Sequence, residues 1–162
     1  MLSKACIFSL GLLVVATPTL AQDYQHGDLT ISHPWSRPTP PGTPVGVGYM
    51  TISNRGDAAV TLVAGQTPLA ARVSIHETTM QDGLMKMRPL KDGLTVAAGE
   101  TVTLKPHSYH LMLEQLERPL MEGDEVPLTL TFEELDPIAI KLHVEQPGAA
   151  PAMDHSGGHQ SH

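Results

Sequence analysis

Thiols are almost missing from this chain, which has one cysteine, Cys6, among 162 residues. Cys6 lies in an N-terminal segment that we expect to be removed, which would leave a mature protein without any thiol. Disulfides, iron–sulfur clusters, cysteine-type zinc sites and cysteine nucleophiles are then excluded. A lipid-anchored cysteine is not expected either, because Cys6 precedes the apolar stretch of that segment instead of following it.

Long apolar runs are also missing. The stretch Ile7–Ala16 is well under the ~20 residues that a membrane-spanning helix requires. It follows the positive charge of Lys4 and precedes small residues at 19–21, a pattern typical of a secretory signal cleaved after Ala21. We therefore expect residues 1–21 to be a signal peptide and the mature protein to be exported, soluble and without a membrane span.

Positive charge and aromatic rings are scarce. The chain has 10 lysines and arginines against 17 acidic residues, and loss of Lys4 takes its net charge from −7 to −8. The basic residues are scattered singly, whereas a nucleic-acid partner demands a concentrated positive face. Aromatic residues make up 4%, too few for a platform on which single-stranded bases would stack. No nucleic-acid partner is expected.

Apolar and polar residues alternate with a period of two through most of the chain, which is typical of half-buried strands. The clearest runs, 126–132 and 138–144, flank a short polar turn and predict an antiparallel hairpin. Further strands are expected, with turn-forming residues between them, at Asp28–Ser32, Val47–Ser53, Val60–Val63, Arg72–Glu77, Leu84–Leu90, Thr101–Leu104 and Tyr109–Glu114. This pattern predicts an all-β fold, an antiparallel β-sandwich or small Greek-key barrel, in one domain over residues 22–145.

Two segments break the alternation. Residues 34–44 contain five prolines and predict a rigid loop across one end of the domain. Residues 146–162 are rich in Pro, Gly, Ala and Ser, which predicts a disordered tail. The tail nevertheless has several donors for a metal ion: Met153, His155, His159 and His162.

Histidine and methionine share strand faces in the middle of the domain. In the run 109–113 the leucines alternate inward, so His110 and Met112 project together from the other face. The same alternation turns His76 away from the core. Met85 and Met87 share a face as well, but the periodicity leaves open which face that is.

A thioether is a soft ligand and an imidazole a borderline one, so together they suit Cu(I) better than Mg²⁺ or Ca²⁺. Two histidines and two methionines bring no charge, which leaves a bound Cu(I) with one positive charge. Each residue alone has an ordinary explanation, because methionine often fills cores and histidine often lies at surfaces. From the residues alone, a metal site and an ordinary β-domain both remain open.

The spacing of these residues resembles a known signature. His76, ten residues, Met87 and then His110-Leu111-Met112 closely resemble the pattern His-x10-Met-x21-His-x-Met of the PCu(A)C family of periplasmic copper chaperones. Further matches lie at 34–41, 48–54 and 116–124, so the resemblance extends over about residues 28–144.

The resemblance implies a cupredoxin-like fold in the periplasm that binds Cu(I) near its surface through His76, Met87, His110 and Met112. It also implies delivery of copper to the Cu(A) site of cytochrome c oxidase. The partners would be the apo Cu(A) subunit, a thiol-containing relay protein, or both. No enzymatic activity is expected.

The spacing in this chain is one residue longer than in the family pattern. Residues 88–109 put 22 positions between Met87 and His110 instead of 21. An extra residue inside a strand would turn His110 and Met112 to the other face, whereas one in a turn, near 91–93 or 105–108, would be harmless. The intact His-Leu-Met triplet favours a turn, and His107 remains an alternative to His110 as a ligand.

Other functions are weighed on the same residues. A blue-copper electron carrier requires a cysteine thiolate, and a copper oxygenase with an N-terminal histidine would require cleavage before His26. Hydrolase motifs such as Gly-x-Ser-x-Gly and His-Glu-x-x-His are missing. A copper-buffering or tolerance protein would use the same four ligands, and a structural or adhesion module remains as the alternative without metal. The tail histidines predict a second site, for Cu(II).

Overall fold

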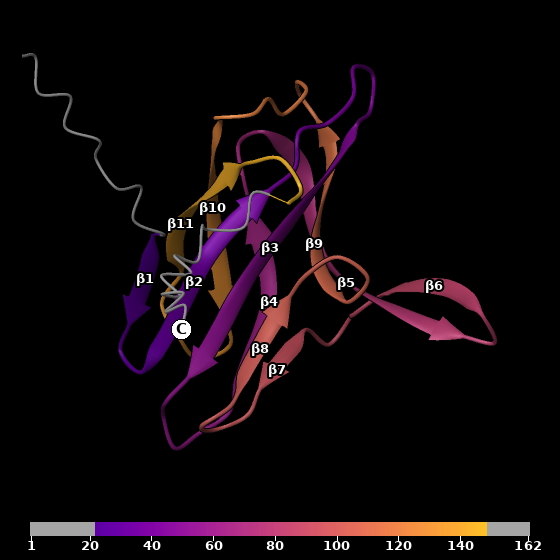
Figure 1. The fold of residues 1–162 in the computed structure, drawn as a ribbon. Coiled ribbons are helices and arrows are strands. Elements are labelled where there is room, and N and C mark those ends of the chain that lie inside the picture. Colours follow the sequence, from indigo (N-terminus) through magenta and orange to yellow (C-terminus); the bar gives the residue numbers. More distant parts are fainter. Residues whose placement is uncertain (1–21, 149–162) are drawn as a thin grey trace, which may run out of the picture.

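The computed structural model describes residues 22–148, which form eleven strands (Figure 1). In chain order these are β1 (Asp23–His26), β2 (Leu29–Ser36), β3 (Val45–Asn54), β4 (Val60–Gln66), β5 (Ala70–Gln81), β6 (Leu84–Pro89), β7 (Leu94–Val96), β8 (Thr101–Leu104), β9 (Tyr109–Leu116), β10 (Glu125–Phe132) and β11 (Ile138–Val144). The all-β prediction is confirmed, and every strand expected from the alternation is present. The expected signal peptide and nearly all of the expected tail lie outside the described residues. Within residues 22–148 no helix is long and apolar enough to cross a bilayer.

Two strands were not expected from the sequence. β1 consists of polar and aromatic residues, and β7 has only three residues, so neither shows a usable alternation. Both pair with the N-terminal part of a longer strand: β1 pairs with residues 29–32 of β2, and β7 pairs with residues 60–62 of β4. They extend the sheet without altering its path.

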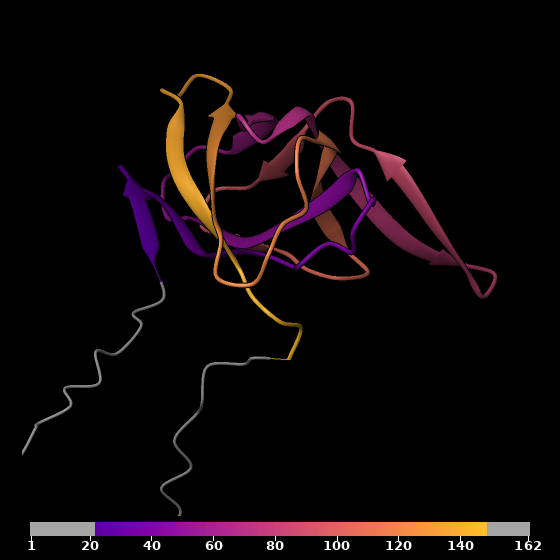
Figure 2. The same ribbon diagram turned by 90° about the horizontal axis from the view of Figure 1, so that it is seen from above.

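The sheet closes on itself. Its strands follow the order β2-β11-β10-β4-β5-β9-β3, and an additional pairing between β3 and β2 completes the ring. The pairing of β2 with β11 is parallel and the other pairings in this ring are antiparallel. Seen from above, the strands surround a flattened interior (Figure 2). The architecture is that of a barrel pressed into two layers, as predicted.

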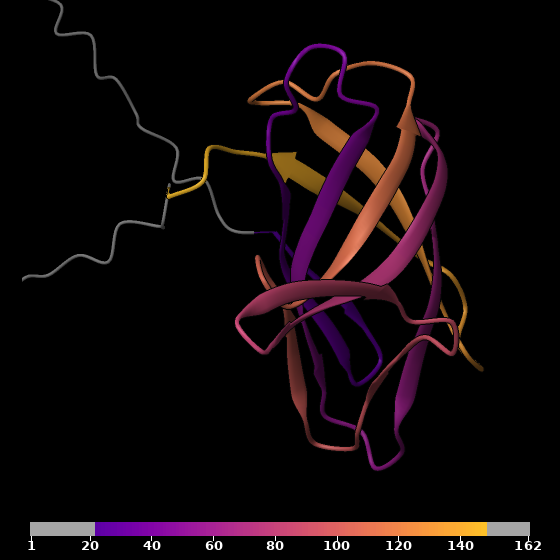
Figure 3. The same cartoon turned by 90° about the vertical axis from the view of Figure 1, so that its right-hand side faces the viewer.

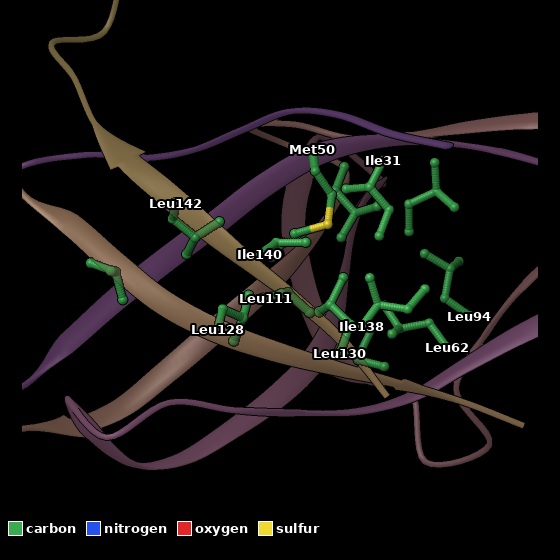
Figure 4. Packing of buried hydrophobic residues seen from close by; sticks show 14 of the residues in the cluster. Ile31, Met50, Leu62, Leu94, Leu111, Leu128, Leu130, Ile138, Ile140 and Leu142 are labelled. Carbon is green, nitrogen blue, oxygen red and sulfur yellow. The ribbon is translucent and has the colours of Figure 1, made fainter. Parts of the chain in front are cut away.

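The interior is filled with aliphatic side chains that converge from both layers (Figure 4). Leu111 and Leu113 of β9 are fully buried there, and Ile75 of β5 is 4% exposed. Because neighbouring residues of a strand point to opposite faces, burial of these three turns the residues between them outward. The outer face of β5 and β9 is therefore where His76, His110 and Met112 lie.

The prediction of a loop over residues 34–44 is wrong at its start. β2 continues through Pro34 to Ser36, and only residues 37–44 form a loop. The register between β2 and β3 shifts between Ser32 and Trp35, and His33 has a φ of 45°. Proline has no N–H for a strand pairing, and such an irregularity is one of the places where a sheet accepts it.

β5 is longer than its partner β9 and leaves the body of the domain at its C-terminal end (Figures 1 and 2). Figure 3 views the domain from this side, with the projecting part in front of the barrel. β6 pairs with this projecting part and forms a hairpin with it. The hairpin turns at Asp82 and Gly83, with φ of 53° and 76°. Positive φ at both positions is what a tight two-residue turn of this kind requires, and Asp-Gly is a preferred sequence for it.

Candidate metal centre

Two histidines face each other across the pairing of β5 with β9. His76 and His110 are direct cross-strand partners, and Ser74 is the partner of Met112. Cross-strand partners project from the same face of a sheet. The imidazole centroids of His76 and His110 are 5.8 Å apart, with their planes at 31°. The structure therefore brings three of the four residues expected from the sequence, His76, His110 and Met112, onto one surface.

The additional residue before His110 does not disturb this arrangement. The pairing of β5 with β9 keeps one register from Ala70 opposite Leu116 to Glu77 opposite Tyr109. A residue inserted within β9 would have shifted that register. The extra position therefore lies between Met87 and the start of β9, and His110 and Met112 keep a common face.

Met87 joins the same face through the hairpin. The register between β5 and β6 pairs Met87 with Thr78. Thr78 is two residues from His76 on β5, so its side chain, and with it that of Met87, projects from the face that carries His76. This answers what the periodicity left open.

Exposure increases from β9 toward the hairpin. His110 is 7% exposed, His76 and Met112 are half-buried, and Met87 is 54% exposed. A site built from these four residues would have one buried imidazole at its base and one accessible thioether at its rim.

Hydrogen bonds orient both imidazoles. Nδ1 of His110 lies 3.1 Å from the carbonyl oxygen of Ser108, which can only accept, so Nδ1 carries the proton and Nε2 keeps a free lone pair. Nε2 of His76 lies 2.9 Å from Oγ of Ser74. Nδ1 of His76 is buried and has no hydrogen-bond partner among residues 22–148. Buried polar atoms nearly always have a partner, so this nitrogen is the one that a bound ion would satisfy.

Burial favours the neutral form of His76. Burial is the main cause that lowers the pKa of His76 below 6.5, with smaller lowering from His110 and Arg72 and an opposing effect from Glu114. Arg72 and Glu114 form an ion pair of 2.8 Å on the same face, one step beyond Ser74 and Met112. A neutral imidazole is the form that binds a metal.

This donor set suits a soft ion. Among the described residues no group of three or more His, Cys, Asp and Glu side chains is placed to hold a metal. The four residues expected from the sequence offer two imidazoles and two thioethers, and thioethers select Cu(I) over ions that prefer oxygen.

Sequence reasoning missed two members of this face, Ser74 and Met80. Both have even numbers on β5, as His76 does, so the alternation that turns His76 outward also applies to them. Met80 is the cross-strand partner of Met85. His107, considered above as an alternative ligand, lies in the turn before β9, with its Nδ1 3.3 Å from Sδ of Met85. The tail residues Met153, His155, His159 and His162 are outside the described part of the chain.

Fold and site together define a class: a closed all-β domain with histidines and methionines gathered on the outer face of one layer. A family model described as "Putative lipoprotein LpqE-like" matches residues 29–144, and the chain belongs to this family. A curated relative, "Putative lipoprotein Lxx21020" of Leifsonia xyli subsp. xyli, is 27% identical over 160 residues, which cover 98% of this chain and 90% of the relative.

Solved structures agree with this assignment. The apo PCuAC domain of PmoF1 is 25% identical with a TM-score of 0.66, over 78% of this chain and 100% of that domain. The Cu(I) form of DR1885 from Deinococcus radiodurans is 31% identical with a TM-score of 0.58, over 70% of this chain and 75% of that protein. The resemblance to the PCu(A)C family and the cupredoxin-like fold are confirmed.

Proposed function

We propose that this protein is an exported copper chaperone. It binds one Cu(I) through His76, Met87, His110 and Met112 and delivers it to the Cu(A) site of cytochrome c oxidase, either directly or through a thiol-containing relay protein. The observation that carries the proposal is the buried Nδ1 of His76, which has no partner in the described part of the chain and lies beside the oriented imidazole of His110. Two thioethers on the same face complete a soft, uncharged donor set.

The hydrogen bonds to both imidazoles support binding of an ion through their other nitrogens. Ser74 and the carbonyl group of Ser108 each hold the nitrogen that does not face the ion. Such partners fix the ring orientation and the tautomer of a ligating histidine. Nδ1 of His76 and Nε2 of His110 are then the two ligating nitrogens.

The graded exposure of the site supports release as well as binding. Met87, the most exposed of the four at 54%, is the ligand that an incoming partner reaches first. A thiolate of the acceptor is a stronger ligand for Cu(I) than a thioether, so it displaces Met87 before the buried His110 is involved. Copper then moves by stepwise exchange without ever being free.

Transfer is tested by mixing the Cu(I)-loaded protein with an apo Cu(A) domain, and separately with a reduced thiol relay protein. A chaperone should lose its copper to at least one of them, at a rate that rises with acceptor concentration. Retention of copper against both would favour the alternative, a periplasmic protein that buffers copper or confers tolerance without specific delivery. Acceptors with serine in place of their ligand cysteines are the control.

Export and the tail site rest on sequence alone and are part of the same proposal. Mass spectrometry of the protein recovered from the periplasm should find Gln22 at the mature N-terminus. Deletion of residues from Gln146 onward should abolish Cu(II) binding by Met153, His155, His159 and His162 and leave Cu(I) affinity nearly unchanged. Loss of Cu(I) binding in the truncated protein would contradict this division between the two sites.

A further inference from the structure

The β5–β6 hairpin holds a second group of soft donors outside the site described above. Met80 and Met85 are cross-strand partners, 67% and 57% exposed. Their face is fixed by the register: Met80 is four residues from His76 on β5, and Met85 is two residues from Met87 on β6. All of these side chains therefore project from the same face of the sheet.

His107 contacts Met85 from the edge of β5 that pairs with β9, opposite to the edge that pairs with β6. It lies in the turn before β9, which is tied to β5 by a 3.0 Å hydrogen bond from the amide of Thr78 to the carbonyl oxygen of Ser108. From there, Nδ1 of His107 approaches Sδ of Met85 to 3.3 Å. Nitrogen and sulfur ligands of one metal, at bonds of about 2.0 and 2.3 Å and tetrahedral angles, lie roughly 3.5 Å apart. The observed separation is close to that of two ligands sharing an ion.

The backbone conformation of His107 indicates that the turn before β9 holds this residue in place. Its φ of 64° is in the left-handed region, which non-glycine residues adopt rarely and at some energetic cost. The turn thereby fixes an exposed imidazole against a thioether that is 57% exposed.

We propose that Met80, Met85 and His107 form an accessory Cu(I) site through which copper enters and leaves the main site. This inference rests on the proposed function. Two residues along a strand span about 7 Å, so the Met80–Met85 pair lies one such step beyond Thr78 and Met87 and two steps beyond His76 and His110. Met87 lies between the two sites and is able to hand the ion from one to the other.

The hairpin projects from the domain (Figures 1 and 2), so the accessory site is open to a partner. Three exposed ligands bind an ion more weakly than a site with a buried histidine. The accessory site therefore fills second and empties first.

Ag(I), a soft ion without redox chemistry, tests this in the full-length protein labelled with ¹³C at its methionine methyl groups. The first equivalent should shift the signals of Met87 and Met112, and the second those of Met80 and Met85. The variant M80L/M85L/H107N should lose the second set of shifts and keep the first. M121L is the matched control, because Met121 is also exposed, at 61%, and lies away from the hairpin.

Leucine keeps the apolar surface and removes only the sulfur, so a hairpin that merely docks partners would behave like wild type. The accessory site would be overturned if the second equivalent left Met80 and Met85 unshifted, for instance by binding Met153 of the tail instead. Failure of the first equivalent to shift Met87 and Met112 would overturn the main site, which is a separate result.

The role in transfer has its own measurement. Release of Cu(I) to excess chelator, followed by stopped flow, should be about tenfold slower in M80L/M85L/H107N, because the variant lacks the ligands that receive the ion from Met87. The equilibrium affinity for the first Cu(I) should stay that of wild type. Unchanged release rates would contradict a passage through the hairpin.

Discussion

At the scale of single residues, the site depends on which imidazole nitrogen is left free. Ser74 holds Nε2 of His76, and the carbonyl group of Ser108 holds Nδ1 of His110. These contacts leave one lone pair on each ring for an ion. The alternation of residues predicts that His76 and His110 face outward, but it says nothing about ring orientation, because that depends on neighbours which meet only after folding.

Replacing Ser74 by alanine should weaken Cu(I) binding. The hydroxyl group contacts the nitrogen of His76 opposite the proposed ligating atom, and loss of such a partner costs about 10–100-fold in metal affinity. Competition against a Cu(I) chelator measures the effect. Ser53→Ala, which removes a hydroxyl group from an exposed pair with Thr101, is the control and should bind as wild type does. Equal affinity of Ser74→Ala and wild type would show that Ser74 does not orient the ligand.

The imidazole of His76 should titrate below 6.5 in the folded apo protein, because burial lowers its pKa. Between that lowered pKa and 6.5 the unfolded chain binds more protons than the folded one. The contribution of this group to stability is therefore complete above pH 6.5 and is lost as the pH falls through the folded-state pKa. NMR titration of the His76 ring tests this, with the chain unfolded in urea as reference. A folded-state midpoint above 6.5 would contradict the prediction.

At the scale of elements, the β5–β6 hairpin supplies what the sequence could not predict. All six residues of β6 are exposed, so no apolar face fixes which way Met87 points. The pairing of Met87 with Thr78 decides it, and that pairing follows from the tight Asp82–Gly83 turn. The faces of β5 and β9, in contrast, were predictable because Ile75, Leu111 and Leu113 must be buried.

Exchanging Lys86 and Met87 on β6 tests directly whether the thioether must lie on the face that carries His76. The double variant K86M/M87K keeps the composition and the exposed character of the strand but moves the thioether to the opposite face. We expect Cu(I) affinity to fall at least tenfold, about 1.4 kcal/mol, as it should in Met87→Leu. Circular dichroism should show an unchanged fold. Binding equal to wild type would mean that Met87 is not a ligand.

At the scale of the whole molecule, we expect the fold to form without the ion. The closed sheet encloses a largely aliphatic core (Figure 4). The four site residues lie on the outer face. The all-β architecture follows from the alternation, and the core residues follow with it. The closure of the sheet between β2 and β3 could not be predicted from the alternation. These strands pair through an irregular register around Pro34 that no local sequence pattern indicates.

The apo protein should therefore be folded and should melt cooperatively. Cu(I) should raise its melting temperature by several degrees, because a ligand at 100 times its Kd stabilises the native state by about 2.7 kcal/mol. Differential scanning calorimetry with and without Cu(I) under anaerobic conditions measures this. His110→Ala should melt as a folded protein whose transition responds much less than that of wild type to one equivalent of Cu(I). An apo protein without a cooperative transition would contradict a copper-independent fold.

The most direct test of the four-residue site is X-ray absorption of the protein loaded with one equivalent of Cu(I), with the tail removed. We predict two nitrogen and two sulfur ligands, with one sulfur lost in Met87→Leu and one in Met112→Leu. A spectrum without sulfur, or one that neither substitution changes, would contradict the assignment of His76, Met87, His110 and Met112 as the copper ligands.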